Sequence, residues 1–178
     1  MKHWRMRPMP YMILAAALVA LDQLVKYLVV QHIQPLGHVP LIPHILELTY
    51  VENTGAAFSL FSEHTWILAG VSLLMSVVLA VAIWKNFFRH PVGKVTLTLL
   101  LAGAVGNLID RVLRGYVVDM FNVLFMDFAV FNVADICVVV GGIAAGLYYL
   151  FLSEKLENRG KKTPGEDGKA DGETDADR

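Results

Sequence analysis

Four long apolar stretches dominate the pattern of hydrophobic and polar positions along this 178-residue chain. A helix that crosses a membrane needs roughly 20 mostly apolar residues. Stretches of that kind occur at about residues 11–30, 65–84, 92–109 and 133–152. The pattern therefore predicts an all-α integral membrane protein with four transmembrane helices.

Composition supports this prediction, because the charged residues gather at the C-terminal end. In residues 153–178, 14 of the 26 residues are charged, which leaves 17 charged residues among the first 152. So few charges could not cover the surface of a soluble domain of that size. The tail has no aromatic residue from residue 160 onward and is rich in Gly, Asp, Glu and Lys. We expect it to be disordered.

Composition also argues against two other classes of protein. The chain shows no basic stripe with interleaved aromatic residues, so we expect no nucleic acid as a partner. The single cysteine excludes an internal disulfide framework and a multi-cysteine metal site. Within the fourth apolar stretch we expect three small residues to serve helix packing: Cys137, Gly142 and Gly146.

The distribution of Lys and Arg predicts how the chain is oriented. Basic residues flank the apolar stretches in residues 1–10, between the second and third stretches, and after residue 152, whereas residues 31–64 contain none. Because basic residues favour the cytoplasmic side of a membrane, we expect both termini to be cytoplasmic. Residues 31–64 and 110–132 would then face outward.

The first outward stretch has a pattern of its own. Residues 45–51 are rich in strand-forming side chains, and Asn53, Thr54 and Gly55 then provide turn chemistry. We expect a small extracytoplasmic strand or hairpin here. The same stretch holds four histidines without the spacing of a metalloprotease motif, and we expect them to be solvated or interfacial: His32, His38, His44 and His64.

Asp22 and Lys26 are ionisable residues inside the first apolar stretch, where a charge is costly. They lie one helical turn apart and can pair on one face of a helix. Such an ion pair could serve only to make the helix insertable. It could also support a polar site at the outer end of the helix.

A second group of polar residues ends the third apolar stretch. Gly103, Asn107 and Arg111 recur at four-residue spacing, with Asp110 beside Arg111. Close helix packing explains the glycine. It does not explain Arg111 next to Asp110 at the membrane boundary, where charged groups must find partners.

Asp119 and Asp135 are candidates for chemistry. The predicted topology returns both to the outer interface, with four phenylalanines between them. Two carboxylates held close together in an apolar setting share one proton, so that one can activate water while the other polarises a carbonyl. Asn132 could orient one of them. The alternative is that both are helix-terminal aspartates, which the helix dipole favours.

Two other functions remain open on the residues alone. Carboxylates together with an asparagine could bind a divalent cation, as a metal-dependent hydrolase would require. A small transporter or proton-relay protein would instead use the carboxylates as a polar path: Asp22, Asp110, Asp119 and Asp135.

Five blocks of sequence resemble the bacterial lipoprotein signal peptidase family, also called signal peptidase II. They are residues 22–26 (DQLVK), 52–59 (ENTGAAFS), 103–111 (GAVGNLIDR), 115–119 (GYVVD) and 131–135 (FNVAD). The blocks occur in the order and at the spacing of the family, across about residues 10–152. Ala102 and Met120 depart from the usual Gly and Phe of the family, and neither change removes a polar group.

The resemblance implies an aspartic endopeptidase of the bacterial inner membrane, with its active site near the outer leaflet. It would remove signal peptides from diacylglyceryl-modified prolipoproteins, cutting just before the lipidated cysteine. We expect a monomer in membrane lipid, without metal or cofactor. The resemblance identifies Asp119 and Asp135 as the catalytic pair and leaves open which of them is the base. Supporting residues would be Asn53, Gly55, Asn107, Arg111, Asn132, Asp22 and Lys26.

Overall fold

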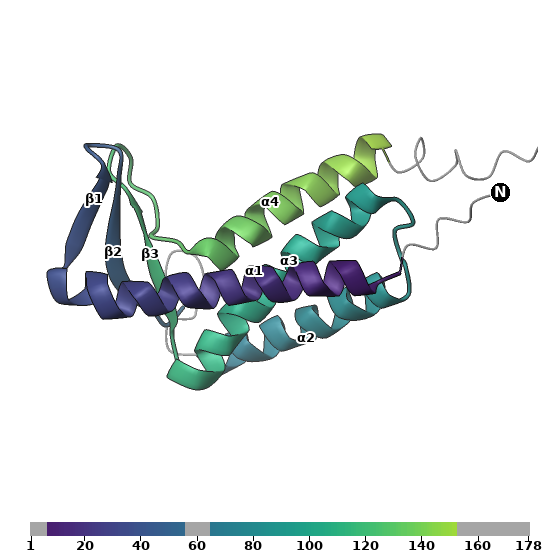
Figure 1. Cartoon of the computed structure of the whole chain (residues 1–178), viewed down its shortest axis with the longest axis horizontal. Helices are drawn as coiled ribbons and strands as arrows, with labels where there is room; N and C mark the ends of the chain where they lie inside the picture. Colours follow the sequence, from purple (N-terminus) through teal and green to yellow (C-terminus); the bar gives the residue numbers. More distant parts are fainter. Residues whose placement is uncertain (1–6, 56–64, 153–178) are drawn as a thin grey trace, which may run out of the picture.

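The structure is a computed structural model that describes residues 7–55 and 65–152. Four helices form a bundle, and three strands form a small sheet at one end of it (Figure 1). The order along the chain is α1 (Met9–Leu28), β1 (His38–Ile42), β2 (Leu46–Asn53), α2 (Thr65–Trp84), α3 (Pro91–Arg114), β3 (Val117–Val123) and α4 (Val133–Leu147). The tail predicted to be disordered, residues 153–178, lies outside the described residues.

Within the described residues, four helices are long and apolar enough to cross a membrane, as the sequence predicts. α1 continues through a π-helical turn (Val29–Ile33) and a 3-10 turn (Gln34–Leu36), and a π-helical turn (Tyr148–Leu152) extends α4. α3 ends at Arg114 rather than near residue 109. Gly115 terminates it with a positive φ of 81°, and its N–H donates to the carbonyl of Arg111. Asp110 and Arg111 therefore lie within the last turns of α3.

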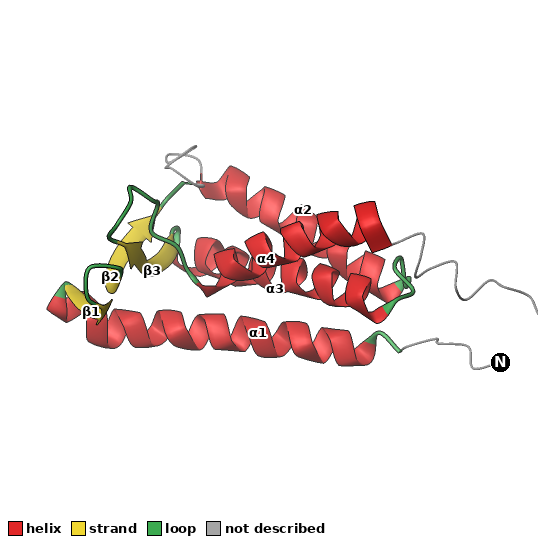
Figure 2. Cartoon of the chain, turned by 90° about the horizontal axis from the view of Figure 1, so that it is seen from above, coloured by secondary structure: helices red, strands yellow, loops and turns green. Residues whose placement is uncertain are grey.

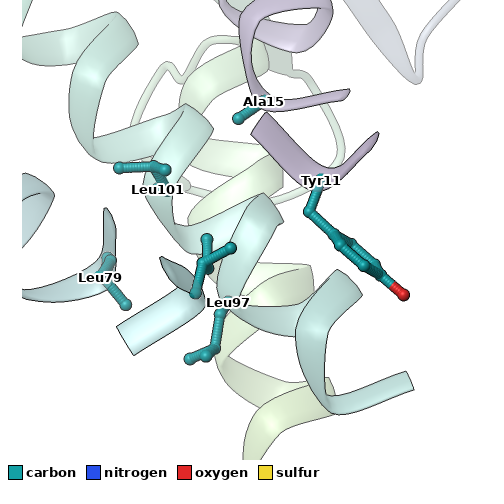
Figure 3. Packing of buried hydrophobic residues seen from close by; sticks show 6 residues of the cluster. Tyr11, Ala15, Leu79, Leu97 and Leu101 are labelled. Atoms are coloured by element: carbon teal, nitrogen blue, oxygen red, sulfur yellow. The ribbon is translucent and has the colours of Figure 1, made fainter. Parts of the chain in front are cut away.

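α3 is the central helix of the bundle. It packs against α1, α2 and α4, and Figure 2 shows α1 and α2 on opposite sides of the other two helices. Half of its apolar window is buried, against 22% or less for the other three helices. Apolar side chains of three helices meet along it in the bundle core, including Ala15, Leu79, Leu97 and Leu101 (Figure 3).

Glycines at two positions allow the close approach of α4 to α3. A Cβ added at Gly103 would overlap the backbone of Ala134, and one at Gly141 would lie 2.9 Å from the Leu99 side chain. The expected packing role of Gly142 and Gly146 is wrong for Gly146. A Cβ there would meet no described atom within 4 Å, and one at Gly142 would only touch Leu100 at 4.0 Å. Cys137, by contrast, is buried as expected.

The sheet is antiparallel, in the order β1-β2-β3. β1 and β2 form a hairpin within residues 31–64, where the sequence predicts a strand or hairpin, but its turn lies at residues 43–45, before the strand-rich segment rather than after it. β3 comes from the connection between α3 and α4, where the sequence pattern did not predict a strand. It pairs with β2 so that Val117 lies opposite Asn53 and Asp119 opposite Val51. This pairing joins the connection between α1 and α2 to the connection between α3 and α4 at one end of the bundle.

The start of α1 and the end of α4 lie at the end of the bundle opposite the sheet (Figure 1). The chain therefore enters and leaves the four-helix bundle on one side.

Candidate active site

Asp119 lies on β3 with 1% of its surface exposed. Each carboxylate oxygen accepts a hydrogen bond from a side-chain amide. Asn53 Nδ2 on β2 donates to Oδ2 at 2.8 Å, and Asn132 Nδ2 donates to Oδ1 at 2.6 Å. Burial raises the pKa of Asp119 to about 6, although both amide hydrogen bonds act to lower it.

Asp135 lies in the first turn of α4, where it also caps the helix. Its backbone N–H donates to Asn132 Oδ1 at 2.9 Å, and its Oδ2 accepts the backbone N–H of Asn132 at 3.1 Å. This reciprocal pair is a capping box. The other carboxylate oxygen, Oδ1, accepts from Asn107 Nδ2 at 2.8 Å. Asp135 keeps partial exposure, so a reactant can approach its carboxylate.

Asn132 joins the two aspartates. Its backbone N–H bonds the Asp135 carboxylate and its side-chain amide bonds the Asp119 carboxylate. The two carboxylates are close enough that the charge of Asp135 contributes to the raised pKa of Asp119. The structure therefore brings together, through one asparagine, the two carboxylates that the sequence singles out.

A buried ion network lies behind this pair, between α1 and α3. The Lys26 ammonium is 3.0 Å from Asp22 Oδ2, 3.0 Å from Asp110 Oδ2 and 3.0 Å from Asn107 Oδ1. All three charged groups are almost fully buried. Gln23 adds a hydrogen bond to Asp22. The ion pair that the sequence predicts within α1 is thus confirmed, and a second carboxylate on α3 completes it.

Arg111 contacts the turn after β2. Its Nη2 donates to the carbonyl of Gly55 at 3.3 Å, and its Nη1 lies 3.4 Å from Ser72 Oγ on α2. The same turn is closed by Asn53 Oδ1, which accepts the N–H of Gly55 at 2.9 Å. Between the described residues, Arg111 makes no hydrogen bond with Asp119 or Asp135. The positive charge of Arg111 therefore lies beside the turn after β2 and acts on the two aspartates without a direct hydrogen bond.

Known proteins that are similar to this chain in sequence are lipoprotein signal peptidases. A sequence model of the family described as signal peptidase (SPase) II matches residues 14–151. The lipoprotein signal peptidase of Enterococcus faecalis is 44% identical, over 85% of this chain and 93% of that protein. That of Caldanaerobacter subterraneus is 42% identical, over 78% of this chain and 94% of that protein. The chain belongs to the signal peptidase II family.

Solved structures agree with this membership. One bacterial membrane enzyme structure superposes with a TM-score of 0.71 at 30% identity, covering 88% of this chain and 93% of that one. A second superposes with a TM-score of 0.72 at 30% identity, covering 80% and 93%. As a signal peptidase II protein with four apolar helices, the chain is a multi-pass membrane peptidase.

The sequence-predicted site residues gather at the junction of the helices with the sheet. Asn53, Asn107 and Asn132 bond the two aspartates directly. Asp22 and Lys26 support them from behind, whereas Gly55 and Arg111 form the turn at the side. The described histidines of residues 31–64 are exposed, as expected: His32, His38 and His44. His64 lies outside the described residues.

Sequence reasoning missed the roles of three polar residues. Asp110 bonds Lys26, Gln23 bonds the backbone of Gly106 at 3.1 Å, and Ser72 receives Arg111. Asp110 carried a signal, since a charge at the membrane boundary must find a partner. Ser72 carried none, because serines are ordinary in an apolar helix.

Proposed function

We propose that this protein is an aspartic endopeptidase that removes signal peptides from diacylglyceryl-modified prolipoproteins, with Asp119 and Asp135 as its catalytic pair. The observation that carries the proposal is the bridging of both carboxylates by Asn132. Membership in the signal peptidase II family supports the substrate class. The cut is expected just before the lipidated cysteine.

The expected reaction is the attack of water on the scissile peptide bond, assisted by the two carboxylates. With one proton shared between them, the ionised carboxylate takes a proton from water while the protonated one donates to the carbonyl of the scissile bond. Hydroxide attack gives a tetrahedral intermediate, and the proton on the first carboxylate then passes to the leaving amine. Asn53, Asn107 and Asn132 hold the carboxylates throughout. We expect this reaction to need neither a metal nor a cofactor.

The position of the site suits a substrate that stays in the bilayer. The aspartates lie where the helices meet the sheet, at one end of the bundle (Figure 1). The Lys and Arg pattern assigns the opposite end to the cytoplasm. We therefore place the site near the outer leaflet of the bacterial inner membrane, with both termini cytoplasmic. The protein would act as a monomer surrounded by membrane lipid.

The network of buried carboxylates fits a proton relay less well. A relay across the membrane needs ionisable groups spread over its depth. Among the described residues, the buried carboxylates Asp22, Asp110 and Asp119 all belong to the one network around Lys26 and Asn132. The carboxylates therefore support a single site rather than a path.

The test is cleavage of a purified prolipoprotein by the purified protein in detergent, with a chelator in a parallel reaction. Matched precursors with and without the diacylglyceryl group are compared, and the product is identified by mass spectrometry. We expect only the lipidated precursor to be cut, immediately before its cysteine and at the same rate with chelator. Cleavage at another bond, or flux in proteoliposomes without proteolysis, would contradict the proposal.

A further inference from the structure

Lys26 occupies the centre of the buried network and uses its whole donor capacity there. An ammonium group has three N–H donors and no acceptor. Its three neighbours are Asp22 Oδ2, Asp110 Oδ2 and Asn107 Oδ1, each at 3.0 Å. Lys26 has no exposed surface. It therefore cannot reach a substrate, and any effect on catalysis must pass through these neighbours.

The two carboxylates bound to Lys26 each hold the backbone next to a candidate catalytic residue. Asp22 Oδ1 accepts the N–H of Ala134 at 2.9 Å, and Ala134 immediately precedes Asp135. Asp110 Oδ2 accepts the N–H of Val118 at 3.1 Å, and Val118 immediately precedes Asp119. The Lys26 ammonium therefore holds Asp22 and Asp110 in place, and these two carboxylates hold the backbone next to Asp135 and Asp119.

The third neighbour sets the orientation of an amide. Asn107 Oδ1 faces Lys26 Nζ, which can only donate, so the NH₂ group of Asn107 must face the other way. It does so at 2.8 Å from Asp135 Oδ1. If the amide flipped, its carbonyl oxygen would face a carboxylate oxygen without a proton between them. Lys26 therefore favours the orientation that supplies Asp135 with a donor, together with Asn132 Nδ2, which donates to Asn107 Oδ1 at 3.2 Å.

Gly106 on α3 allows the Asp22 carboxylate to pack directly against the backbone of that helix. A Cβ added at Gly106 would lie 2.7 Å from Asp22 Oδ2 and 3.1 Å from the Ala134 Cβ. Asp22 therefore has no room to move away from Ala134 on the side of α3. The positions of these groups follow from packing as well as from charge.

We propose that Lys26 is a positioning residue of the peptidase, holding Asp119 and Asp135 in register through Asp110, Asp22 and Asn107. This inference rests on the proposed function, because it assumes that the two aspartates perform the chemistry. A purely structural ion pair, which only makes α1 insertable, would affect folding but not the properties of the folded enzyme. The two possibilities differ in kcat and in the pH profile.

The charges around Lys26 set the expected pH effect. α1 contributes Asp22, β3 contributes Asp119 and α4 contributes Asp135; α3 contributes Asp110, Arg111 and Arg114, whose Nε is 3.5 Å from Asp110 Oδ1. Burial is the main cause of the raised pKa of Asp119, and the positive charge of Lys26 acts to lower it. Removing that charge should therefore move the titration of Asp119 to higher pH.

The experiment compares Lys26→Met with Lys94→Met in the cleavage assay. Lys94 is also a buried lysine of the bundle whose Nζ contacts an asparagine, Asn86 Oδ1 at 2.6 Å, but it packs beside Tyr11 near the start of α1, far from the site. Because a misplacement of about 1 Å can cost about 100-fold in rate, we expect kcat of Lys26→Met to fall by about that factor with KM little changed. Its pH profile should move to higher pH. Lys94→Met should change thermal stability without changing either quantity.

A second variant covers the case in which Lys26→Met does not fold. Lys26→Gln combined with Asp110→Asn leaves the formal charge of the network unchanged and keeps hydrogen-bonding groups at both positions. We expect a fall in kcat of the folded double variant, with KM retained. A folded Lys26 variant that keeps the wild-type kcat and pH profile would overturn the proposal.

A double-mutant cycle with Asn107→Ala measures how much of the effect of Lys26 on Asp135 passes through the Asn107 amide. In the Asn107→Ala background, Lys26→Met should lower kcat by a smaller factor than in the wild type, since one route of its effect is already lost. If Lys26→Met lowers kcat by the same factor in both backgrounds, the claim that Lys26 acts through Asn107 is wrong.

Parallel assays of Asp119→Asn and Asp135→Asn distinguish the two levels of failure. If either variant keeps the wild-type rate, the catalytic pair is wrong and the inference about Lys26 falls with it. If both are inactive while the Lys26 variants retain full kcat, only the inference about Lys26 is wrong.

Discussion

Asn132 Nδ2 lies 2.6 Å from Asp119 Oδ1, so the residue that caps α4 also holds a carboxylate of the sheet. The amide can take only one orientation, because its oxygen accepts the backbone N–H of Asp135. The start of α4 and the middle of β3 are thereby locked together. The same residue that caps α4 therefore also holds the two candidate catalytic carboxylates together.

Asn132→Ser should separate the two duties of this residue. Serine is about as good an N-cap as asparagine, so α4 should keep its first turn. Serine lacks the amide that reaches Asp119, so the donor to Oδ1 is lost. We expect thermal stability close to that of the wild type and cleavage slowed by up to about 100-fold, because a misplacement of about 1 Å at an active site can cost that much in rate. Asn132→Ala, which loses the cap as well, should also melt at a lower temperature. Equal cleavage rates for Asn132→Ser and the wild type would contradict this division of roles.

The raised pKa of Asp119 should appear as a pH-dependent difference in stability between the wild type and Asp119→Asn. Its folded pKa is about 6, whereas an unfolded aspartate titrates near about 3.9. The folded protein therefore binds more protons between these values, and wild-type stability should fall as pH rises from about 4 to about 6. The variant has no proton to lose there.

The measurement is the melting temperature of both proteins in detergent between pH 4 and pH 8. The melting temperature of Asp119→Asn minus that of the wild type should increase with pH and level off above the folded pKa. Asp127→Asn is the control, because Asp127 is exposed on the same connection. A difference that is constant or that decreases with pH would show that the burial of Asp119 is not costly.

Gly103→Ala should destabilise the bundle, and Gly146→Ala should not. The new methyl group at residue 103 would meet the carbonyl of Ala134 and the Val138 side chain, which α4 cannot move without disturbing the cap at Asn132. At residue 146 it would meet no described atom within 4 Å. Overpacking of this kind costs about 1–3 kcal/mol. Melting temperatures of the two variants decide the matter, and similar values would contradict the packing described at α3.

The helices were predictable because membrane spans are a local property of the sequence. Length and apolar character alone locate α1, α2, α3 and α4. β2 was also local, since residues 45–51 are rich in strand formers and the turn at Asn53 and Gly55 ends the strand. Its hairpin partner β1 lies before it and is joined to it through residues 43–45. β3 was not predicted. Its pairing partner lies more than 60 residues away, at Asn53, and strand pairing of that range leaves little local trace.

The site shows the same division. The spacing of Asp22 and Lys26 on one helix was enough to predict their ion pair, because residues four apart are neighbours. The contact of Lys26 with Asp110 joins two helices and has no counterpart in spacing along the chain. Sequence could say that Asp110 needs a partner. Only the packing of α1 against α3 in the structure identifies Lys26 as that partner.

The most direct measurement is the cleavage rate of a diacylglyceryl-modified prolipoprotein by the wild type, Asp119→Asn and Asp135→Asn, with the folding of each protein checked by its melting transition. Each substitution keeps the size of the side chain and removes the proton-accepting carboxylate. If the two aspartates share the chemistry, both variants should fold and neither should cut the precursor. A folded variant of either kind that cuts at the wild-type rate would contradict the catalytic pair.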